Sequence, residues 1–392
     1  MFQFLSTRFS KSDVIAEYAI EPAQAVSFQD ACRHVAAASI GVSPEAFVRG
    51  DAPAVVSLDK GGQVALIRYP ADLFEPGNAD QISHSLTGHL QLPSVKRATL
   101  LDMQFPRTLV KSFPGPRFGV KGIRKLIGTN QALLEASLLQ GSSYEFSMNA
   151  YEAWTGMDIV ADAPSLTNLP SNRFKERVFQ THRRKKKAEQ LNGGHKMYMP
   201  NVTGSETVKR ADFAHTLGCE AVVLNLSGFS SLQNLREADV PVAIQLQRSV
   251  RMPHMSSHAC AKLCRLAGAD IVHIGSLPGP MNADASVHVH DVIDKRLIEE
   301  RSLAKPWHGV KSSMGLACRV GASHIPGLVQ RLGNDLVIQF TDAVSGHSHG
   351  VRKGAMACRQ ALDSHLHHIP LQVYGLKHSE LRESLASLQP RF

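Results

Sequence analysis

Polar side chains that could take part in proton transfer stand directly after short apolar segments in the long C-terminal part of the chain. Two of them are acids and one is an amide: Asp162, Asn201 and Asp342. Side chains of this kind can exchange protons with a bound substrate or hold its oxygens. We name these three as the candidate catalytic residues.

Cationic side chains follow other apolar segments of the same region, namely Arg248, Arg251, His273 and Arg319. The guanidinium group is planar, permanently charged and suited to phosphate. Cationic residues at strand ends are therefore suited to an anionic partner. The alternative is that Arg248 pairs only with a structural acid.

Eight short apolar segments separated by amphipathic stretches must position these side chains. They are predicted strands at 132–138, 157–161, 197–202, 221–226, 242–247, 271–274, 315–320 and 336–340. Near-continuous apolar strands with intervening helices indicate a parallel sheet covered on both faces, and eight of them can close a (β/α)8 barrel. The chemistry of such barrels lies at the carboxyl ends of the strands, where the candidate residues stand.

The first part of the chain has a different order of elements: strand, helix, strand, strand, helix, strand. This order is typical of a ferredoxin-like α+β domain. The predicted class is therefore α/β, with a ferredoxin-like domain over residues 1–112, a linker over 113–128 and a (β/α)8 TIM barrel over 129–392.

Composition limits the partners. The net charge of +9 over 392 residues favours anions, and the densest basic run, His182–Lys187, is predicted to lie at the far end of an amphipathic helix. Nucleic acid is not an expected partner because no binding motif accompanies the run. No segment is apolar enough for a membrane span and the six cysteines lack framework spacing, so a cytoplasmic protein with reduced thiols is expected.

Several segments together resemble the large subunit of ribulose bisphosphate carboxylase/oxygenase (RuBisCO) and the RuBisCO-like proteins. The most specific are 112–128, which reads SFPGPRFGVKGIRKLIG, and 324–340, which reads HIPGLVQRLGNDLVIQF. Gly346-His347, 201–204 and 272–275 also match turns and strand ends of that family. The resemblance implies the same two-domain fold and a homodimer or a multiple of it.

The resemblance also implies positions for a Mg²⁺ ion, which in this family is held by a carbamylated lysine, an aspartate and a glutamate. These positions fall on Ala161, Ala163 and Pro164. No lysine stands between Lys125 and Lys175, so the family's first-strand lysine position, near Glu135 or Leu139, has none either. We therefore expect no cofactor and a degenerate, RuBisCO-like site.

The family's phosphate-binding pair corresponds to Arg248 and His273, which are both present. Arg251 and Arg319 could add to this site, whereas Asp342 would repel an anion at the second phosphate position. The family's histidine on the fifth strand becomes Gln247. The resemblance thus implies one retained phosphate site and one lost.

These residues predict a divergent, form IV-like RuBisCO-like protein that does not fix CO₂ and binds a phosphorylated small molecule through Arg248 and His273. A metal-independent isomerase or lyase acting on a sugar-phosphate-like keto or enol substrate is the first alternative. A non-catalytic assembly or regulatory protein is the second.

Three weaker patterns remain. His254 and His258 have helical spacing but do not make a convincing zinc site, and Cys318 is either a nucleophile or a buried inert thiol. Histidines near the C-terminus are expected to be surface or capping residues: His347, His349, His365, His367 and His368.

Overall fold

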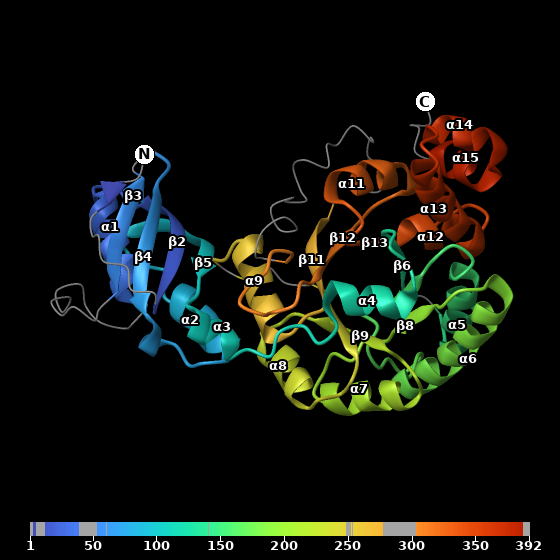
Figure 1. The fold of residues 1–392 in the computed structure, drawn as a ribbon, viewed down its shortest axis with the longest axis horizontal. Helices are drawn as coiled ribbons and strands as arrows, with labels where there is room; N and C mark the ends of the chain where they lie inside the picture. The colour runs from blue at the N-terminus through green and yellow to red at the C-terminus, as the bar shows by residue number, and fades with distance from the viewer. Residues whose placement is uncertain are drawn as a thin grey trace.

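A computed structural model describes residues 3–4, 12–38, 53–59, 61–139, 141–247, 252, 254–276 and 303–386. Two sheets organise the chain: a small antiparallel sheet formed by the N-terminal part, blue in Figure 1, and a larger parallel sheet surrounded by helices. The predicted fold class is confirmed. The domain boundaries at residues 112 and 128 stay a prediction.

The N-terminal sheet has the order β1-β3-β4-β2-β5 with α1 and α2 in the chain between its strands. Alternate residues of β2 and β4 are buried, as expected when a sheet has one covered face. The short β1 was not predicted. The elements are β1 (Gln3–Phe4), β2 (Asp13–Pro22), α1 (Phe28–Ala38), β3 (Ala54–Asp59), β4 (Val64–Pro70), α2 (Ala79–Thr87) and β5 (Val95–Gln104).

The second sheet has eight parallel strands in the order β8-β7-β6-β13-β12-β11-β10-β9. A parallel bridge between Asn201 and Val223 brings the two end strands together and nearly closes the barrel. The strands are β6 (Leu133–Leu138), β7 (Ile159–Asp162), β8 (Met197–Met199), β9 (Ala221–Asn225), β10 (Ala243–Gln247), β11 (Ile271–Ser276), β12 (Met314–Cys318) and β13 (Leu336–Phe340).

Helices follow the barrel strands and cover them from outside (Figure 1). They are α5 (Ser143–Ala153), α6 (Phe174–Asn192), α7 (Thr207–Thr216), α8 (Ser230–Glu237), α9 (Ser257–Ala267), α11 (Ile325–Leu332), α12 (Asp342–Ser345) and α13 (Val351–Leu366), followed by α14 (Leu371–Lys377) and α15 (Ser379–Ala386). A short helix, α3 (Arg107–Lys111), precedes the predicted linker.

The predicted linker contains a helix, α4 (Gly119–Ile127), with a structural role in the barrel. Its buried Val120, Ile123 and Ile127 belong to the same apolar cluster as the interior side chains of the strands. This cluster includes Leu133 and Val337, which are near the amino ends of β6 and β13. The helix therefore closes the amino end of the barrel and leaves the carboxyl end for function.

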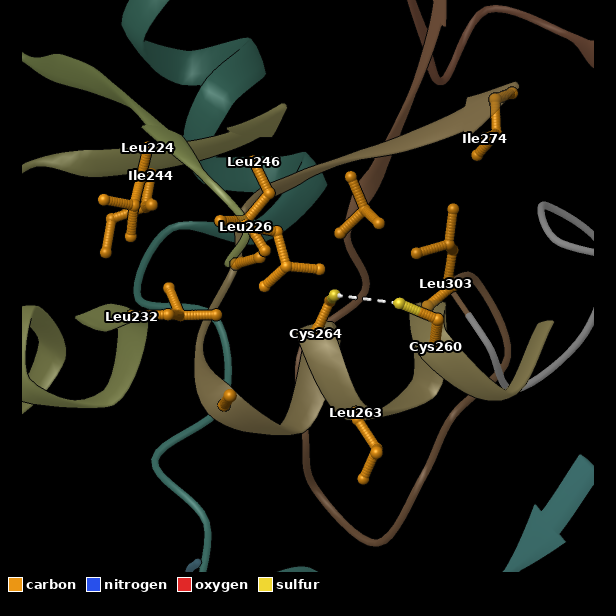
Figure 2. Packing of buried hydrophobic residues seen from close by; sticks show 14 of the residues in the cluster. Leu224, Leu226, Leu232, Ile244, Leu246, Cys260, Leu263, Cys264, Ile274 and Leu303 are labelled. Carbon is orange, nitrogen blue, oxygen red and sulfur yellow. Dashed lines mark hydrogen bonds between the residues drawn. The ribbon is translucent and has the colours of Figure 1, made fainter. Parts of the chain in front are cut away.

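The outward faces of the strands pack against the helices in a second apolar cluster. Figure 2 shows part of it, where Leu224, Leu246 and Ile274 of neighbouring strands face Cys260 and Cys264 of α9. The two sulfur atoms are 4.0 Å apart, and neither cysteine forms a disulfide. These thiols are core groups, and the metal-ligand cluster found among the described residues does not include them.

His254 and His258 connect the barrel to the N-terminal sheet. His254 precedes α9 with a positive φ of 57°, and its Nδ1 lies 3.0 Å from the carbonyl oxygen of Ala98. His258 Nε2 lies 3.4 Å from Asp102 of β5. The two imidazoles therefore do not share a helical face, and their partners are in the N-terminal sheet.

None of the helices among the described residues is long and apolar enough to cross a membrane.

Candidate active site

The predicted site residues that the structure describes lie in the barrel strands or directly after them. Asp162 ends β7, Asn201 follows β8, His273 lies in β11, Arg319 follows β12 and Asp342 begins α12 directly after β13. In a parallel barrel these strand ends form one rim. Arg248 and Arg251 lie outside the described residues.

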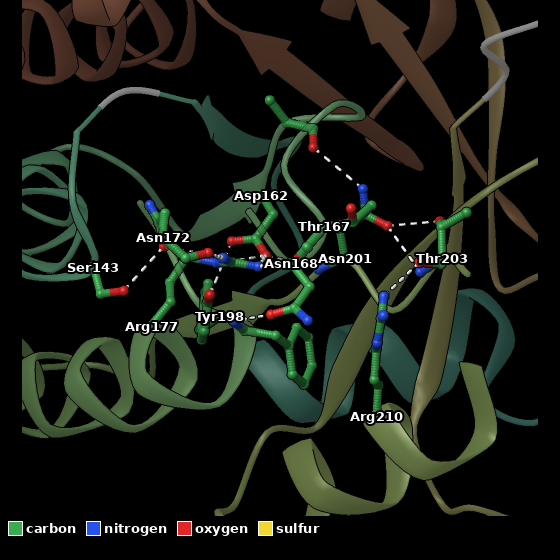
Figure 3. A network of polar contacts seen from close by, with 12 residues as sticks. Ser143, Asp162, Thr167, Asn168, Asn172, Arg177, Tyr198, Asn201, Thr203 and Arg210 are labelled. Carbon is green, nitrogen blue, oxygen red and sulfur yellow. Dashed lines mark hydrogen bonds and ion pairs between the residues drawn. The ribbon is translucent and has the colours of Figure 1, made fainter. Parts of the chain in front are cut away.

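Asp162 is a fully engaged structural acid (Figure 3). Its Oδ2 accepts hydrogen bonds from Nε and Nη2 of Arg177, at 3.1 and 2.9 Å, and from the backbone N–H of Asn201 at 2.8 Å. Its Oδ1 accepts from the Tyr198 hydroxyl at 2.8 Å. Both oxygens are therefore used within the protein, which leaves Asp162 poorly placed for proton transfer.

The Asp162–Arg177 pair has no solvent exposure at either side chain. Burial lowers the pKa of Arg177, but the adjacent Asp162 carboxylate more than offsets this and holds the pKa above its usual value. The remaining guanidinium N–H groups donate to Asn172 and to the Thr167 carbonyl. The pair therefore fixes the segment after β7 against α6.

Asn201 and Asn225 brace the same segment from the neighbouring strands. Nδ2 of Asn201 donates to the carbonyl oxygens of Ala163 and Pro164, at 3.2 and 2.9 Å, and Nδ2 of Asn225 donates to that of Pro164 at 2.8 Å. Oδ1 of Asn201 accepts from the backbone N–H and hydroxyl of Thr203. Asn201 is thus also committed to positioning the loop.

The three implied metal-ligand positions carry no oxygen-bearing side chain. Ala161 is fully buried in the interior apolar cluster, Ala163 is 5% exposed, and Pro164 is exposed. Asp162 between them faces Arg177 on the helix side. The end of β7 therefore offers methyl groups to the barrel interior.

The cationic candidates that the structure describes are His273 and Arg319. His273 is half-buried and pairs in register with Leu316, and Arg319 is exposed just after β12 with a positive φ of 58°. Asp342 is exposed at the start of α12. The described part of the strand ends thus has one arginine and one histidine, with an acid after the next strand.

A polar cluster inside the barrel was not predicted as a site. Glu135 of β6 is fully buried, and its Oε1 accepts hydrogen bonds from Nε2 of Gln245 at 2.9 Å and from Nε2 of Gln339 at 2.6 Å. Oε1 of Gln339 accepts from the Cys318 thiol at 3.1 Å. Four strands, β6, β10, β12 and β13, therefore contribute to one interior hydrogen-bond network.

Several atoms of this interior have no hydrogen-bond partner among the described residues. They are Oε2 of Glu135, Oε1 of Gln245 and both polar side-chain atoms of Gln247. Burial raises the pKa of Glu135 to about 7, although the two amide donors act in the opposite direction. Unpartnered buried polar atoms are uncommon in folded proteins.

The sequence did carry a signal for this cluster. Glu135, Gln245 and Gln339 are polar residues inside mostly apolar strands. In register, Gln339 pairs with Glu135, and their side chains point to the barrel interior together with those of Leu133 and Val337. A polar residue at an interior position of a barrel strand is the pattern that would have identified the site.

The remaining patterns resolve as structural. Burial raises the pKa of the Cys318 thiol well above its usual value, so it is a poor nucleophile.

The basic run, His182–Lys187, lies in the middle of α6, which continues to Asn192, so its predicted place at the helix end was wrong. Lys185 of this run is buried and pairs with Glu189 and Glu220, at 3.5 and 3.2 Å.

The C-terminal histidines divide into two groups. His347 and His349 lie near Glu383, with His349 Nδ1 3.1 Å from the carboxylate. The backbone N–H of His349 donates to Nδ1 of His347, which places the proton of a neutral His347 ring on Nε2 and disfavours metal binding there. His367 instead stacks on Tyr374 near the last helices.

Comparison with known proteins identifies both parts of the chain. Residues 3–109 match the ribulose bisphosphate carboxylase large chain, N-terminal domain, and residues 139–388 match its catalytic domain. Ribulose bisphosphate carboxylase of Methanosarcina mazei is 32% identical and the match covers 96% of each chain. That of Pyrococcus furiosus is 33% identical over 96% of this chain and 94% of the relative.

Solved structures show the same fold. Octameric RuBisCO from Pyrococcus horikoshii superimposes with a TM-score of 0.86 at 30% identity, covering 97% of this chain and 95% of the other. Dimeric RuBisCO from Hyperthermus butylicus gives a TM-score of 0.82 at 27% identity, covering 97% and 96%. These structural neighbours are self-associating proteins.

The comparisons overturn the predicted function. A RuBisCO-like protein without CO₂ fixation was expected from the alanines and the proline after β7. The full-length relatives are instead named ribulose bisphosphate carboxylase, at 32 and 33% identity. The comparisons therefore support a carboxylase, and form IV-like status is not shown.

The prediction that no cofactor is used is contradicted for the same reason. It depended on placing the chain outside the carboxylases, and Mg²⁺ is the cofactor implied for those enzymes. Mg²⁺ is usually held by one or two carboxylates together with water and substrate oxygens. At the end of β7 the one carboxylate, Asp162, is occupied by Arg177 and Tyr198. This strand end does not fit the ion.

Both domains of the chain match this family, and relatives exceed 30% identity over nearly the whole chain. The chain therefore belongs to the ribulose bisphosphate carboxylase large chain family.

Proposed function

We propose that this chain acts on ribulose bisphosphate as a carboxylase, the activity for which its relatives are named. The observation that carries the proposal is the extent of the match, which covers 96% of both this chain and the Methanosarcina mazei enzyme. A second support is the barrel, whose rim keeps polar and cationic side chains at the strand ends.

The departure of this site from the family pattern is confined and specific. Ala161, Ala163 and Pro164 supply no metal ligand, and Asp162 is held by Arg177. Direct measurement of carboxylation is therefore the decisive experiment.

The assay measures acid-stable ¹⁴C formed from labelled bicarbonate, ribulose bisphosphate and Mg²⁺ by the purified protein. We expect incorporation that depends on ribulose bisphosphate and is lost on heating the protein. Incorporation equal to that of a mock purification from cells without the gene would contradict the proposal.

We further propose that the phosphates of the substrate contact Arg248, His273, Arg251 and Arg319. Two of these residues are described by the structure: His273 lies within β11 and Arg319 directly follows the neighbouring strand β12. Arginine is suited to phosphate because its guanidinium donates charge-assisted, paired hydrogen bonds.

Arg248→Ala is therefore expected to weaken ribulose bisphosphate binding about ten- to a hundredfold, because a hydrogen bond to a charged group contributes about 1.5–3 kcal/mol. Calorimetry at two salt concentrations measures this, and added salt should weaken binding by the wild type. Arg107→Ala, an exposed change in α3, is the matched control. Equal affinity of wild type and Arg248→Ala would assign Arg248 a structural role.

We propose that the chain forms a homodimer, because its structural neighbours are dimeric and octameric. Sedimentation equilibrium at micromolar concentration should give twice the monomer mass or a multiple of it. A monomer throughout that range would contradict this. We also propose a cytoplasmic location, which fits six buried cysteines that are all free.

A further inference from the structure

An exposed stripe runs along α6 on the outside of the barrel, beside α5 (Figure 1). Its members stand four residues apart in the helix: Phe179, Arg183, Lys187 and Leu191. All four side chains are exposed, and the two apolar ones strongly so, at 49% for Phe179 and 72% for Leu191. At the rise of an α-helix the stripe is about 18 Å long. It therefore places two cations between two large apolar side chains.

Arginine side chains lie over the aromatic rings of this surface. The guanidinium carbon of Arg183 is 5.7 Å from the ring centroid of Phe179, and that of Arg184 is 5.7 Å from the ring centroid of Tyr144 of α5. Tyr144 is 58% exposed. These cation–π contacts restrict long side chains before a partner arrives, so less conformational entropy is lost on binding. Arginine and aromatic residues are also enriched in protein–protein interfaces.

The positive charge of the stripe is not neutralised within the described part of the chain. Arg183 and Lys187 are exposed and form neither an ion pair nor a side-chain hydrogen bond with another described residue. The helix contains two acids. Glu189 pairs with the buried Lys185, and Glu176 lies in the first turn, before the stripe begins. The cations are therefore available to a negatively charged partner.

The protonation of His182, on the same helix, is affected by this charge. Burial lowers the pKa of His182, and Lys185 and Lys186 lower it further, although Glu189 and Glu220 act in the opposite direction. The pKa remains below its usual value, as expected beside a group of cations.

A second copy of the chain does not fit the stripe. Two α6 helices packed antiparallel about a two-fold axis would place Arg183 and Lys187 of one copy against the same cations of the other. Like charges in contact oppose association. A bilayer does not fit either, because cations separate Phe179 from Leu191 and the continuous apolar side of α6, which includes Val178, is buried against the barrel.

We propose that this stripe is a docking surface for an acidic helix of another protein. Residues four apart form the ridge of a helix that packs into the groove of a second helix. Two carboxylates of the incoming helix pair with Arg183 and Lys187, and apolar side chains on either side of them cover Phe179 and Leu191. A nucleic acid supplies phosphates for the cations but leaves Leu191 uncovered, so an acidic helix is the better match.

The test is fluorescence anisotropy of a labelled helical peptide with the full-length protein. One face of the peptide carries two glutamates between two leucines, each four residues apart. We expect a dissociation constant on the order of micromolar at low salt, because a single helix buries less area than a standard interface. Replacing both glutamates of the peptide with glutamine should weaken binding by about five- to thirtyfold, since two exposed ion pairs are lost. Equal binding of the two peptides would overturn the proposal.

Charge reversal in the protein locates the surface. Arg183→Glu combined with Lys187→Glu should weaken peptide binding by more than about thirtyfold, because it sets like charges against the glutamates. Lys377→Glu combined with Arg382→Glu, at exposed positions of α14 and α15, makes the same change in net charge and should leave binding unchanged. An equal loss in both double variants would show that net charge alone attracts the peptide, which contradicts a defined surface.

A third double variant tests the apolar part of the stripe. Phe179→Ser combined with Leu191→Ser keeps every charge and should weaken peptide binding by about tenfold, because the apolar contacts are lost. Unchanged affinity in this variant would reject a helix with apolar groups as the partner. The substituted residues are exposed, so the melting temperature of each variant should equal that of the wild type. The glutamine peptide tests the same charges with the protein unaltered.

Duplex DNA and vesicles of anionic phospholipid are the competing probes. We expect both to bind the wild type more weakly than the glutamate peptide does. If either binds more tightly, and Arg183→Glu combined with Lys187→Glu removes that binding, the stripe serves a nucleic acid or a membrane and the proposal fails.

Discussion

Replacing Arg177 with methionine is expected to lower the free energy of unfolding by about 3–5 kcal/mol. The substitution leaves Asp162 as a buried charge without its cation, and this costs more than the loss of an exposed pair. Urea unfolding followed by circular dichroism measures the change. Lys187→Met, an exposed substitution on the same helix, should alter the same free energy by less than about 0.5 kcal/mol.

A double variant tests the cause of this effect. Asp162→Asn combined with Arg177→Met removes both charges, so the pair should be less destabilising than the sum of the two single substitutions. Strict additivity would show that the two residues do not interact energetically. Such a result would remove the argument that Asp162 is reserved for structure.

Asp270→Ala is expected to have a similarly large effect, about 3–5 kcal/mol, because it leaves Arg236 as a buried cation. One carboxylate oxygen of Asp270 accepts from the backbone N–H groups of Phe118 and Gly119 at the start of α4, at 2.7 and 2.8 Å. The other accepts from Arg236 Nη2 at 2.8 Å and from the backbone N–H of Ile244 at 2.9 Å.

Asp335→Ala is the matched control for this change, because Asp335 also pairs with an arginine, Arg124, but is 56% exposed. Exposed pairs contribute at most about 1 kcal/mol. Comparable unfolding free energies for the two variants would mean that the buried network of Asp270 does not hold α4 on the barrel.

The strands of this protein were predictable because their signal is local. Apolar runs such as 336–340 reappear as the buried strand β13 with the same bounds. The linker helix α4 was missed, because the glycines within it and the prolines just before it are typical of a connection. Its helical form depends on packing Ile123 and Ile127 into the end of the barrel.

The site was only partly predictable. The sequence placed Asp162 and Asn201 at the strand ends, where they are found, but assigned both to chemistry. The structure shows that Arg177, fifteen residues further along the chain, occupies Asp162. No local sequence pattern predicts this ion pair, because it depends on how α6 packs beside the end of β7 in the folded chain.

By itself the sequence determined the order of elements, the family and the residues at the rim, because periodicity and motif spacing are properties of neighbouring residues. Only the tertiary structure decided which polar side chains share an environment. Glu135 is 110 residues from Gln245 and 204 from Gln339, and barrel closure alone brings them into contact. Burial then shifts the protonation of Glu135, because the cost of a charge depends on everything packed around it.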